Sequence, residues 1–320
     1  MARLAVVGSL NMDLVIKSPR LPERGETVTG GAFATFPGGK GANQAVAAAR
    51  LGGRVTMVGA TGDDAFGRQL RDGLARDRID TAHVAVIAGD ASGVALITVD
   101  PRGQNTIVVA PGANWRLTPQ HVEAARDAIA GSRVLLLQLE VPIEGVTRAA
   151  EIAHEAGALV VLDPAPAPAA PLPDRLLRIV DVINPNEVEA RALTGIAVDD
   201  ERSARAAAER LLAMGCGAAV IKLGARGAFA AAPRAGGGGL LQMVPGLAVE
   251  AVDTTAAGDA FAGALGAALA EGIPILDAVR FATIAAAISV TRMGAQPSMP
   301  TRADVDAFAR TRGIAVPPRS

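Results

Sequence analysis

Short runs of β-branched and aliphatic residues alternate along the chain with longer stretches rich in Ala, Leu and Arg. Continuously apolar runs bounded by turn residues predict strands, and longer stretches with apolar positions three or four apart predict helices. The predicted strands are 3–9, 54–60, 94–100, 105–110, 134–140, 158–163, 180–184 and 218–224. The predicted helices are 42–51, 64–77, 118–129, 144–156, 186–194, 200–214, 258–270 and 275–292.

From about residue 118 onward, strand and helix alternate regularly, and the strands there are continuously apolar. Strands of that kind are typical of a sheet that helices cover on both faces. The pattern therefore predicts the α/β class, with a doubly wound, mostly parallel sheet flanked by helices. In such a sheet, ligands bind at the carboxyl ends of the strands.

Two segments interrupt this alternation. Residues 14–36 alternate extended pieces with turns, and residues 94–110 have the pattern of a hairpin with "DPRGQ" at its turn. Neither segment contains a predicted helix. We expect the two segments to pair as a small β-sheet lid beside the main part of a single domain that spans residues 1–320.

Composition excludes several classes of protein. Half of the 320 residues are hydrophobic, which excludes a disordered chain. Aromatic residues make up only 2% and tyrosine is absent, which disfavours binding of single-stranded nucleic acid by base stacking. The net charge is −1, without a cluster of Lys and Arg, so we expect no nucleic-acid partner.

The single cysteine, Cys216, excludes an internal disulfide framework and is typical of a reducing compartment. The apolar N-terminus is interrupted by Asp13 and a Gly-Ser pair, so it is too short and too polar for a signal peptide or a membrane span. We therefore expect a soluble cytoplasmic protein without a membrane partner.

Polar residues follow two of the predicted strands. In "GSLNMD", Asn11 and Asp13 are two residues apart, so in an extended chain they share a face suited to a hydroxyl-rich ligand. An Asx turn that leaves the strand explains the same residues. In "QLE", Glu140 ends an apolar strand, where it either contacts a ligand or lies at the surface.

A glycine-rich segment, "FPGGKGANQA", leads into a predicted helix. It is not a P-loop, because Gly41 follows Lys40 where that motif requires Ser or Thr. Its glycines let the backbone approach a ligand closely, and Lys40 and Asn43 add polar donors. A glycine-rich helix entry without a ligand remains an alternative.

Two later motifs also have two explanations each. In "NPNEVE", Asn186 and Glu189 have the spacing of a capping box, and the same pair could position a metal ion or a phosphate. The turn "KLGARG" follows a buried strand, and its two glycines are a weak indication of a ligand site. The three histidines are isolated along the chain, and we assign them no role.

The segment "DTTAAGDAF" carries the strongest chemical indication. Ala256, Ala257 and Gly258 lie where a helix begins, and the amides of a first helical turn have no partner within the helix. Their small side chains leave an anion site exposed at the positive end of the helix dipole. A carboxylate in an anion site, here Asp259, is explained if it acts as a base. It would take a proton from an alcohol while the amides stabilise the charge on a transferring phosphoryl group.

The order of these motifs, followed by "GAQPS", resembles the ribokinase-like (PfkB) family of carbohydrate kinases over essentially the full chain. The resemblance implies one large α/β domain with a β lid. It implies transfer of the γ-phosphoryl group of ATP to the 5-hydroxyl of D-ribose, with Mg²⁺ and a monovalent cation such as K⁺. It also implies a homodimer that forms through the lids.

The resemblance further implies roles for individual residues. It assigns the base to Asp259 and the anion hole to the amides of Ala256, Ala257 and Gly258. The resemblance implies that the sugar is contacted by Asn11, Asp13, Gly39, Lys40, Asn43, Glu140 and Asp259. Those for ATP are Asn186, Lys222, Leu223, Gly224, Ala225, Arg226, Gly227, Gly258 and Thr283. Those for K⁺ are Asp253, Thr255, Ser289, Arg292, Gly294 and Ser298, and Glu189 would organise Mg²⁺ through water.

The chain departs from the family pattern at two positions. Thr is common where this chain has Ala260, and Thr is also seen where it has Lys222. These departures leave the nucleotide preference open. Alternative hypotheses are a kinase for 2-deoxyribose, another pentose or a nucleoside, and a sugar-sensing or nucleotide-sensing protein without catalysis. A nicotinamide dehydrogenase ranks low, because no G-x-G-x-x-G follows the first strand.

Overall fold

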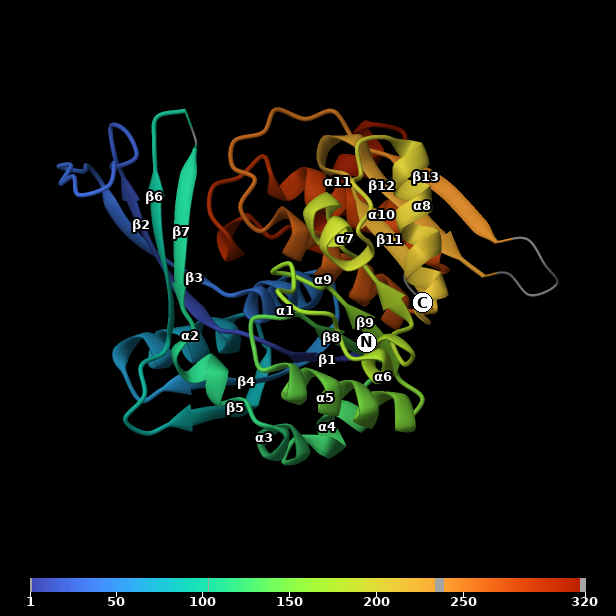
Figure 1. The fold of residues 1–320 in the computed structure, drawn as a ribbon, viewed down its shortest axis with the longest axis horizontal. Coiled ribbons are helices and arrows are strands. Elements are labelled where there is room, and N and C mark those ends of the chain that lie inside the picture. Colours follow the sequence, from blue (N-terminus) through green and yellow to red (C-terminus); the bar gives the residue numbers. More distant parts are fainter. Residues whose placement is uncertain (1, 103, 234–238, 317–320) are drawn as a thin grey trace.

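The computed structural model describes residues 2–102, 104–233 and 239–316. A nine-stranded sheet forms its centre, in the order β13-β12-β11-β10-β9-β8-β1-β4-β5 (Figure 1). The strands from β11 to β5 run parallel, and β12 and β13 extend one edge in antiparallel fashion. Their bounds are β1 Arg3–Val7, β4 Arg54–Gly62, β5 Asp80–Ile87, β8 Val134–Leu137, β9 Leu159–Leu162, β10 Val182–Ile183, β11 Ala218–Lys222, β12 Gly227–Ala232 and β13 Leu240–Pro245.

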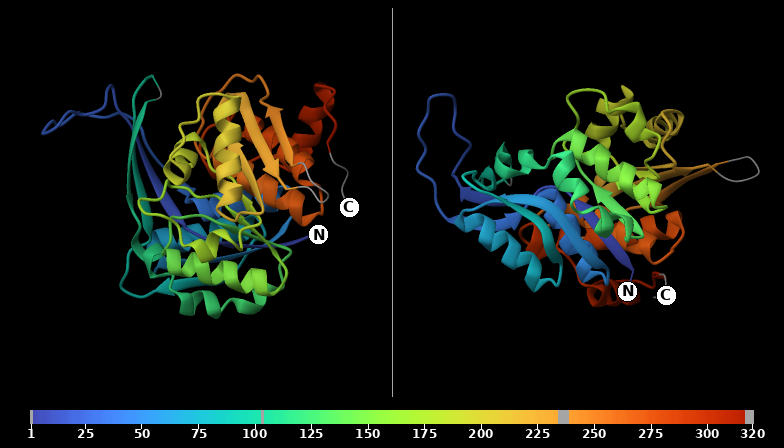
Figure 2. Two further views of the ribbon diagram at one scale, coloured as in Figure 1. Left: turned by 45° about the vertical axis from the view of Figure 1, so that its right-hand side comes forward. Right: turned by 90° about the horizontal axis from the view of Figure 1, so that it is seen from below.

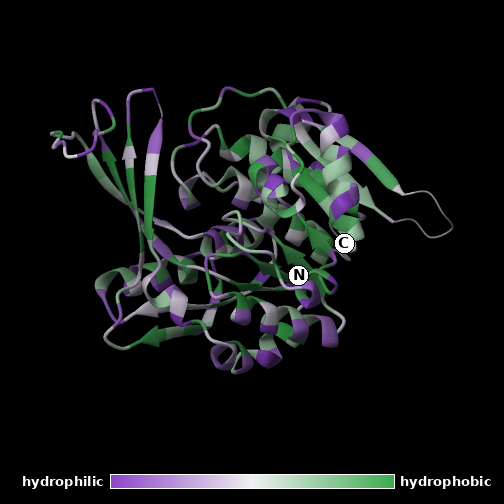
Figure 3. Cartoon of the chain, viewed as in Figure 1, coloured by the Kyte–Doolittle hydropathy of each residue, from purple (hydrophilic) through white to green (hydrophobic). Residues whose placement is uncertain are grey.

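Helices cover both faces of this sheet, and each face has its own hydrophobic core. Along β1, Leu4 and Val6 point into one core and Ala5 and Val7 into the other, as expected for a strand buried on both sides. The first core contains α1 (Lys40–Arg50), α2 (Ala65–Arg76), α9 (Ala257–Ala270), α10 (Ile275–Ser289) and α11 (Arg302–Thr311). The second contains α3 (Pro119–Glu123), α4 (Arg126–Ala130), α5 (Ile143–Glu155), α6 (Asp174–Leu177), α7 (Glu187–Thr194) and α8 (Glu201–Ala213). The central strands are coloured hydrophobic, and the surface helices carry both colours (Figure 3).

Helices α1 and α9 pack unusually closely. A Cβ atom added at Gly263 would lie 2.6 Å from both Ala47 Cβ and Gln44 O. Only glycine permits this approach, because any other side chain would force the helices apart. The close packing brings the first turn of α1 against the first turn of α9, where the polar residues of the site lie.

Four strands form a second, smaller sheet in the order β3-β2-β6-β7, which stands beside the main body (Figures 1 and 2). Its strands are β2 Asn11–Lys17, β3 Phe33–Gly38, β6 Gly93–Val99 and β7 Asn105–Ala110. The pairs β2–β3 and β6–β7 are antiparallel, and β2 and β6 pair in parallel. We call this sheet the lid. Gly103, in the predicted "DPRGQ" turn, lies outside the described residues.

The predicted fold class is confirmed, and several boundaries are corrected. The single helix predicted over 118–129 is wrong, because the chain forms α3 and α4 with two turn residues, Ala124 and Ala125, between them. Val122 and Ile129 both lie in the second core. Strand β5 and helix α11 were not predicted. Short 3-10 turns lie at η1 Gly112–Arg116, η2 Gly224–Arg226 and η3 Gln296–Ser298. Among the described residues, no helix has the length and apolar character needed to cross a membrane.

Candidate active site

Three adjoining pockets lie at the carboxyl ends of the parallel strands, where the fold class predicts a ligand site. The lid pocket, of about 270 Å³, lies between the lid and the start of α9. The polar pocket, of about 300 Å³, lies along the starts of α7 and α9. The apolar pocket, of about 550 Å³, lies between η2, α9 and α10. Thr254 lines all three, so the pockets form one continuous crevice.

The lid pocket brings together every residue predicted to contact the sugar. Its lining includes Asn11, Asp13, Gly39, Lys40, Asn43, Glu140 and Asp259. The lid adds five residues that were not predicted, namely Ala95, Ile97, Asn105, Ile107 and Val109. The alternation of these positions along the predicted 94–110 hairpin could have identified them, because alternate residues of a strand face the same side.

Hydrogen bonds fix the polar groups of the lid pocket. Asn114 Nδ2 donates to Asn11 Oδ1 at 2.7 Å, so the amide group of Asn11 presents its own donors to the pocket. Glu140 Oε2 accepts from Ser9 Oγ at 2.5 Å and from the backbone amide of Lys40 at 3.1 Å. Asn114 is buried and far from Asn11 in sequence, so no local motif indicated its role.

The carboxyl group of Asp13 has a strongly raised pKa. Burial, followed by repulsion from Glu140 and Asp259, raises the pKa of Asp13 to about 7, although Lys40 acts in the opposite direction. Burial lowers the pKa of Lys40, but nearby carboxylates outweigh it, so that pKa is raised and the lysine stays charged. The pocket thus combines a permanent cation with a carboxyl group that titrates near neutral pH.

Asp259 lies in the first turn of α9, at the boundary of the lid pocket and the polar pocket. Its Oδ2 accepts from Asn43 Nδ2 at 2.9 Å, and its Oδ1 accepts from Gln44 Nε2 at 3.3 Å. Burial raises the pKa of Asp259 to about 6, Lys40 lowers it, and the charge of Asp163 raises it. A carboxylate with that pKa is mostly ionised at neutral pH and is suited to accept a proton.

The predicted anion site lies in the backbone that precedes Asp259. Ala256 adopts a left-handed conformation with φ of 57°, which is unusual for a residue other than glycine. This turn leads directly into α9, whose first amides lie at the positive end of the helix dipole. A Cβ atom added at Gly258 would have Lys222 Nζ as its nearest neighbour, at 3.5 Å, so a cationic side chain faces the same amides.

The polar pocket contains the predicted Asn186 and Glu189 together with Lys40, Asp163 and Lys222. The capping box exists, because Asn186 Oδ1 accepts from the amide of Glu189 at 2.9 Å and Glu189 Oε2 accepts from the amide of Asn186 at 2.7 Å. Burial raises the pKa of Glu189, which Lys222 counteracts. Within the described residues, no group of three His, Cys, Asp or Glu side chains is arranged to hold a metal ion alone.

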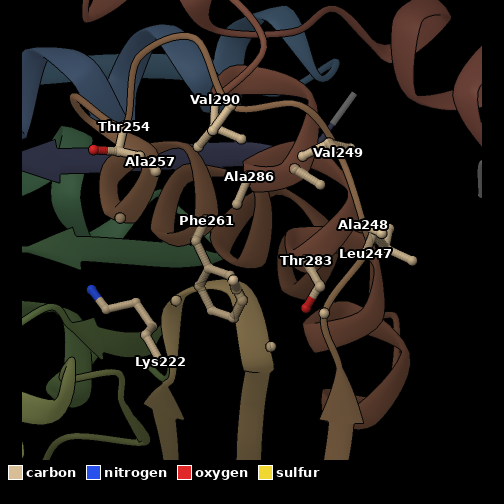
Figure 4. A pocket seen from close by; sticks show the side chains of 17 residues that line it. Lys222, Leu247, Ala248, Val249, Thr254, Ala257, Phe261, Thr283, Ala286 and Val290 are labelled. Carbon is tan, nitrogen blue, oxygen red and sulfur yellow. The ribbon is translucent and has the colours of Figure 1, made fainter. Parts of the chain in front are cut away.

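Most of the residues predicted to bind the nucleotide line the apolar pocket (Figure 4). Lys222, Gly224, Ala225, Gly227, Gly258 and Thr283 line it. Leu223 is instead buried in the second core, and Arg226 forms an ion pair with Glu187. The loop 246–251 contributes much of the wall and was not predicted, because its apolar residues carry no motif. Phe261 and Thr283 face the cavity from α9 and α10 (Figure 4).

The residues predicted for K⁺ lie around two loops that Asp253 joins. Its Oδ1 accepts from the amide of Thr255 at 2.9 Å, and its Oδ2 accepts from the amide of Gly294 at 2.8 Å. The hydroxyl groups of Ser289 and Ser298 donate to carbonyls within their own turns. The side chain of Arg292 pairs with Asp304, so only its backbone is available to the loop.

Comparisons with known proteins find relatives over nearly the whole chain. A family model described as pfkB family carbohydrate kinase matches residues 1–302. The chain is 45% identical over 305 residues to a ribokinase of Haemophilus influenzae, with 95% of this chain and 97% of that protein covered. It is 37% identical over 305 residues to a deoxyribokinase of Salmonella typhi, with 93% and 95% covered. The solved structure of Arabidopsis thaliana ribokinase complexed with ribose and ATP matches it with a TM-score of 0.88 and 33% identity, covering 96% of this chain and 99% of that chain.

Proposed function

Because the chain belongs to the pfkB family of carbohydrate kinases, we propose that it transfers the γ-phosphoryl group of ATP to the 5-hydroxyl of D-ribose, giving D-ribose 5-phosphate. The observation that carries the proposal is the position of Asp259. It lines both the lid pocket, whose walls carry amide and carboxylate side chains, and the polar pocket, which contains Lys40 and Lys222. Both substrates can therefore reach the same carboxylate.

The sugar occupies the lid pocket in this proposal. Asn11, Asp13, Asn43 and Glu140 hydrogen-bond its hydroxyl groups, and Lys40 donates from the floor of the pocket. A hydroxyl missing from the sugar would leave one of these buried groups without a partner, which strongly disfavours binding of the analogue. Lid residues such as Ile107 cover the apolar face of the ring and exclude water.

The nucleotide occupies the other two pockets. Its base lies in the apolar pocket near Thr283, and its phosphates extend past Lys222 toward Gly258. The proton of the sugar hydroxyl passes to Asp259 as the new oxygen–phosphorus bond forms. The bond between the γ-phosphorus and its bridging oxygen breaks, and ADP leaves. The amides of Ala256, Ala257 and Gly258 stabilise the charge on the transferring group.

We propose Mg²⁺ and K⁺ as the cofactor ions. Glu189 and Glu187 give the polar pocket carboxylate oxygens, the ligands that Mg²⁺ prefers, and phosphate oxygens and water would complete its shell. When bound, Mg²⁺ supplies charge neutralisation at the phosphates. Asp253 and the carbonyl groups of its two loops fit a K⁺ ion, which would stabilise the turn that shapes the anion site.

We also propose a homodimer that forms through the lids of a single-domain enzyme. Leu96 and Val108 are opposite each other on β6 and β7, on the lid face turned away from the pocket. They are 53% and 66% exposed. An exposed apolar face of this kind is typical of an interaction surface. We further propose a cytoplasmic location, which the free, buried Cys216 suits.

ADP formation, measured with purified protein across a panel of sugars in K⁺ and in Na⁺, tests this function. We expect turnover with ribose, weaker turnover with 2-deoxyribose and no turnover with 5-deoxyribose, which lacks the accepting hydroxyl. Preference for 2-deoxyribose or a nucleoside would show that the protein is a kinase of the same family with a different substrate. Absence of turnover with every sugar would contradict the proposed function.

A further inference from the structure

A buried carboxylate outside the predicted site residues joins two parts of the crevice. Asp163 follows β9, and its side chain is 2% exposed. Its Oδ1 accepts from Lys222 Nζ at 2.7 Å, and its Oδ2 accepts from Gln44 Nε2 at 2.9 Å. The same Gln44 nitrogen donates to Asp259 Oδ1. One amide group therefore links Asp163 to the carboxylate that we assign as the base.

The orientation of the Gln44 amide is fixed from its other side. Gln138 Nε2 donates to Gln44 Oε1 at 2.6 Å, so the Gln44 nitrogen must face the two carboxylates. Both glutamine side chains are fully buried. Water therefore cannot replace these bonds without a rearrangement of the core. The two hydrogens of the Gln44 amide are matched to the two carboxylates that they face.

Lys222 balances the charge of Asp163. Its side chain is 11% exposed, and the ammonium group lies at the junction of the polar and apolar pockets. Figure 4 shows its Nζ directed away from Phe261 and Thr283. A buried ion pair is weakly stabilising on average, because desolvation offsets the attraction. A pair of this kind at the edge of a reaction site is better explained by positioning than by stability.

We propose that Asp163 and Gln44 are positioning residues for Asp259. Asp163, paired with Lys222, holds the Gln44 amide, and Gln44 in turn orients the Asp259 carboxylate toward the sugar hydroxyl. Asn43 holds the second oxygen of Asp259, so the plane of the carboxylate is fixed at both oxygens. This inference rests on the proposed kinase function, because it assigns the network to the base of that reaction.

Two variants separate the position of the base from its charge environment. Asp163→Asn places an NH₂ group against the Gln44 donor and also removes a negative charge near Asp259. Gln44→Met removes the linking amide at similar volume and leaves the charge of Asp163 in place. Glu271→Gln is the matched control, because Glu271 is a largely buried carboxylate that pairs with Arg302 at the opposite end of α9.

We expect both variants to lower kcat about tenfold or more, the range for loss of a hydrogen bond to a charged group, with the KM values for ribose and ATP within about threefold of wild type. Only Asp163→Asn should also move the acidic limb of the kcat profile to lower pH. The charged groups that still face Asp259 in that variant are Lys40, Asp13 and Glu140, and Lys222, which loses its partner, lines the same pocket. Glu271→Gln should match wild type in both measurements.

Values of kcat within twofold of wild type in both variants would overturn the inference. A loss that is accompanied by an equal loss of ribose affinity and of thermal stability would also overturn it, because that outcome indicates a structural role alone. If Gln44→Met does not fold, Asp163→Asn decides the question through its pH profile. Absence of wild-type turnover would instead reject the proposed function and is distinguishable from both results.

Discussion

Lowering the pH should protonate two carboxyl groups of the lid pocket within the neutral range. Burial and neighbouring carboxylates raise the pKa of Asp259 to about 6 and that of Asp13 to about 7. Asp259 must be ionised to take the proton, and Asp13 must be ionised to accept from sugar hydroxyls. We therefore expect kcat/KM for ribose to fall about tenfold per pH unit just below 7 and about a hundredfold per unit below 6. Carboxyl groups with an ordinary pKa would leave the profile flat over this range.

The assay is coupled ADP detection at saturating ATP and Mg²⁺, with ribose varied between pH 5 and pH 9. The terminal phosphate of ATP also titrates near pH 6, so a variant is needed to separate the protein groups. Asp13→Asn should lower kcat/KM at every pH and reduce the steep part of the profile to about tenfold per unit. A wild-type profile that stays flat down to pH 5, or an unchanged profile shape in Asp13→Asn, would refute the assignment.

Three further predictions follow from other parts of the molecule. Turnover should rise when K⁺ replaces Na⁺ at fixed ionic strength, and Asp253→Ala should abolish that response; a wild-type enzyme indifferent to the cation would remove the proposed role of the loop. Val108→Asp should convert a dimer to a monomer in light scattering, because it places a charge in the apolar lid face, and a monomeric wild type would contradict the proposed interface. Gly263→Ala should lower the free energy of unfolding, measured in urea, by about 1–3 kcal/mol, because the added Cβ overpacks α1 against α9. Gly73→Ala should instead raise it by about 0.5–1 kcal/mol, because the nearest atom to the added Cβ is the flexible end of an arginine side chain at 3.6 Å. Equal effects of the two glycine substitutions would argue against the close helix packing.

The sheet was predictable because its parallel strands are buried on both faces and therefore form continuous apolar runs. Strand β5 was missed because it lies at the edge of the sheet and begins with polar residues, Asp80, Thr81 and His83, so its apolar run is confined to residues 84–88. The break between α3 and α4 was missed for a different reason. Residues 118–129 have helical periodicity throughout, and Val122, Ala125 and Ile129 all lie in the second core, so the apolar pattern does not mark the interruption.

The lid pocket was predictable because its residues belong to short local motifs at strand ends. Each motif alone had an alternative, and the capping box of Asn186 and Glu189 shows that an alternative explanation can hold within a site. Gln44 and Asp163 were not predicted because they are 119 residues apart, and only the packing of α1 against the sheet brings them together. The loop 246–251 was missed because the wall of an apolar pocket needs no particular residue type.

Replacement of Asp259 by asparagine tests directly whether this residue is the base. The variant keeps the shape of the side chain and removes the group that takes the proton. Turnover of ATP with ribose should fall by at least about a hundredfold, the usual effect of losing a positioned base, while calorimetry shows ribose and ATP still binding within about tenfold of wild type. Turnover close to that of the wild-type enzyme would contradict the assignment of Asp259 as the base.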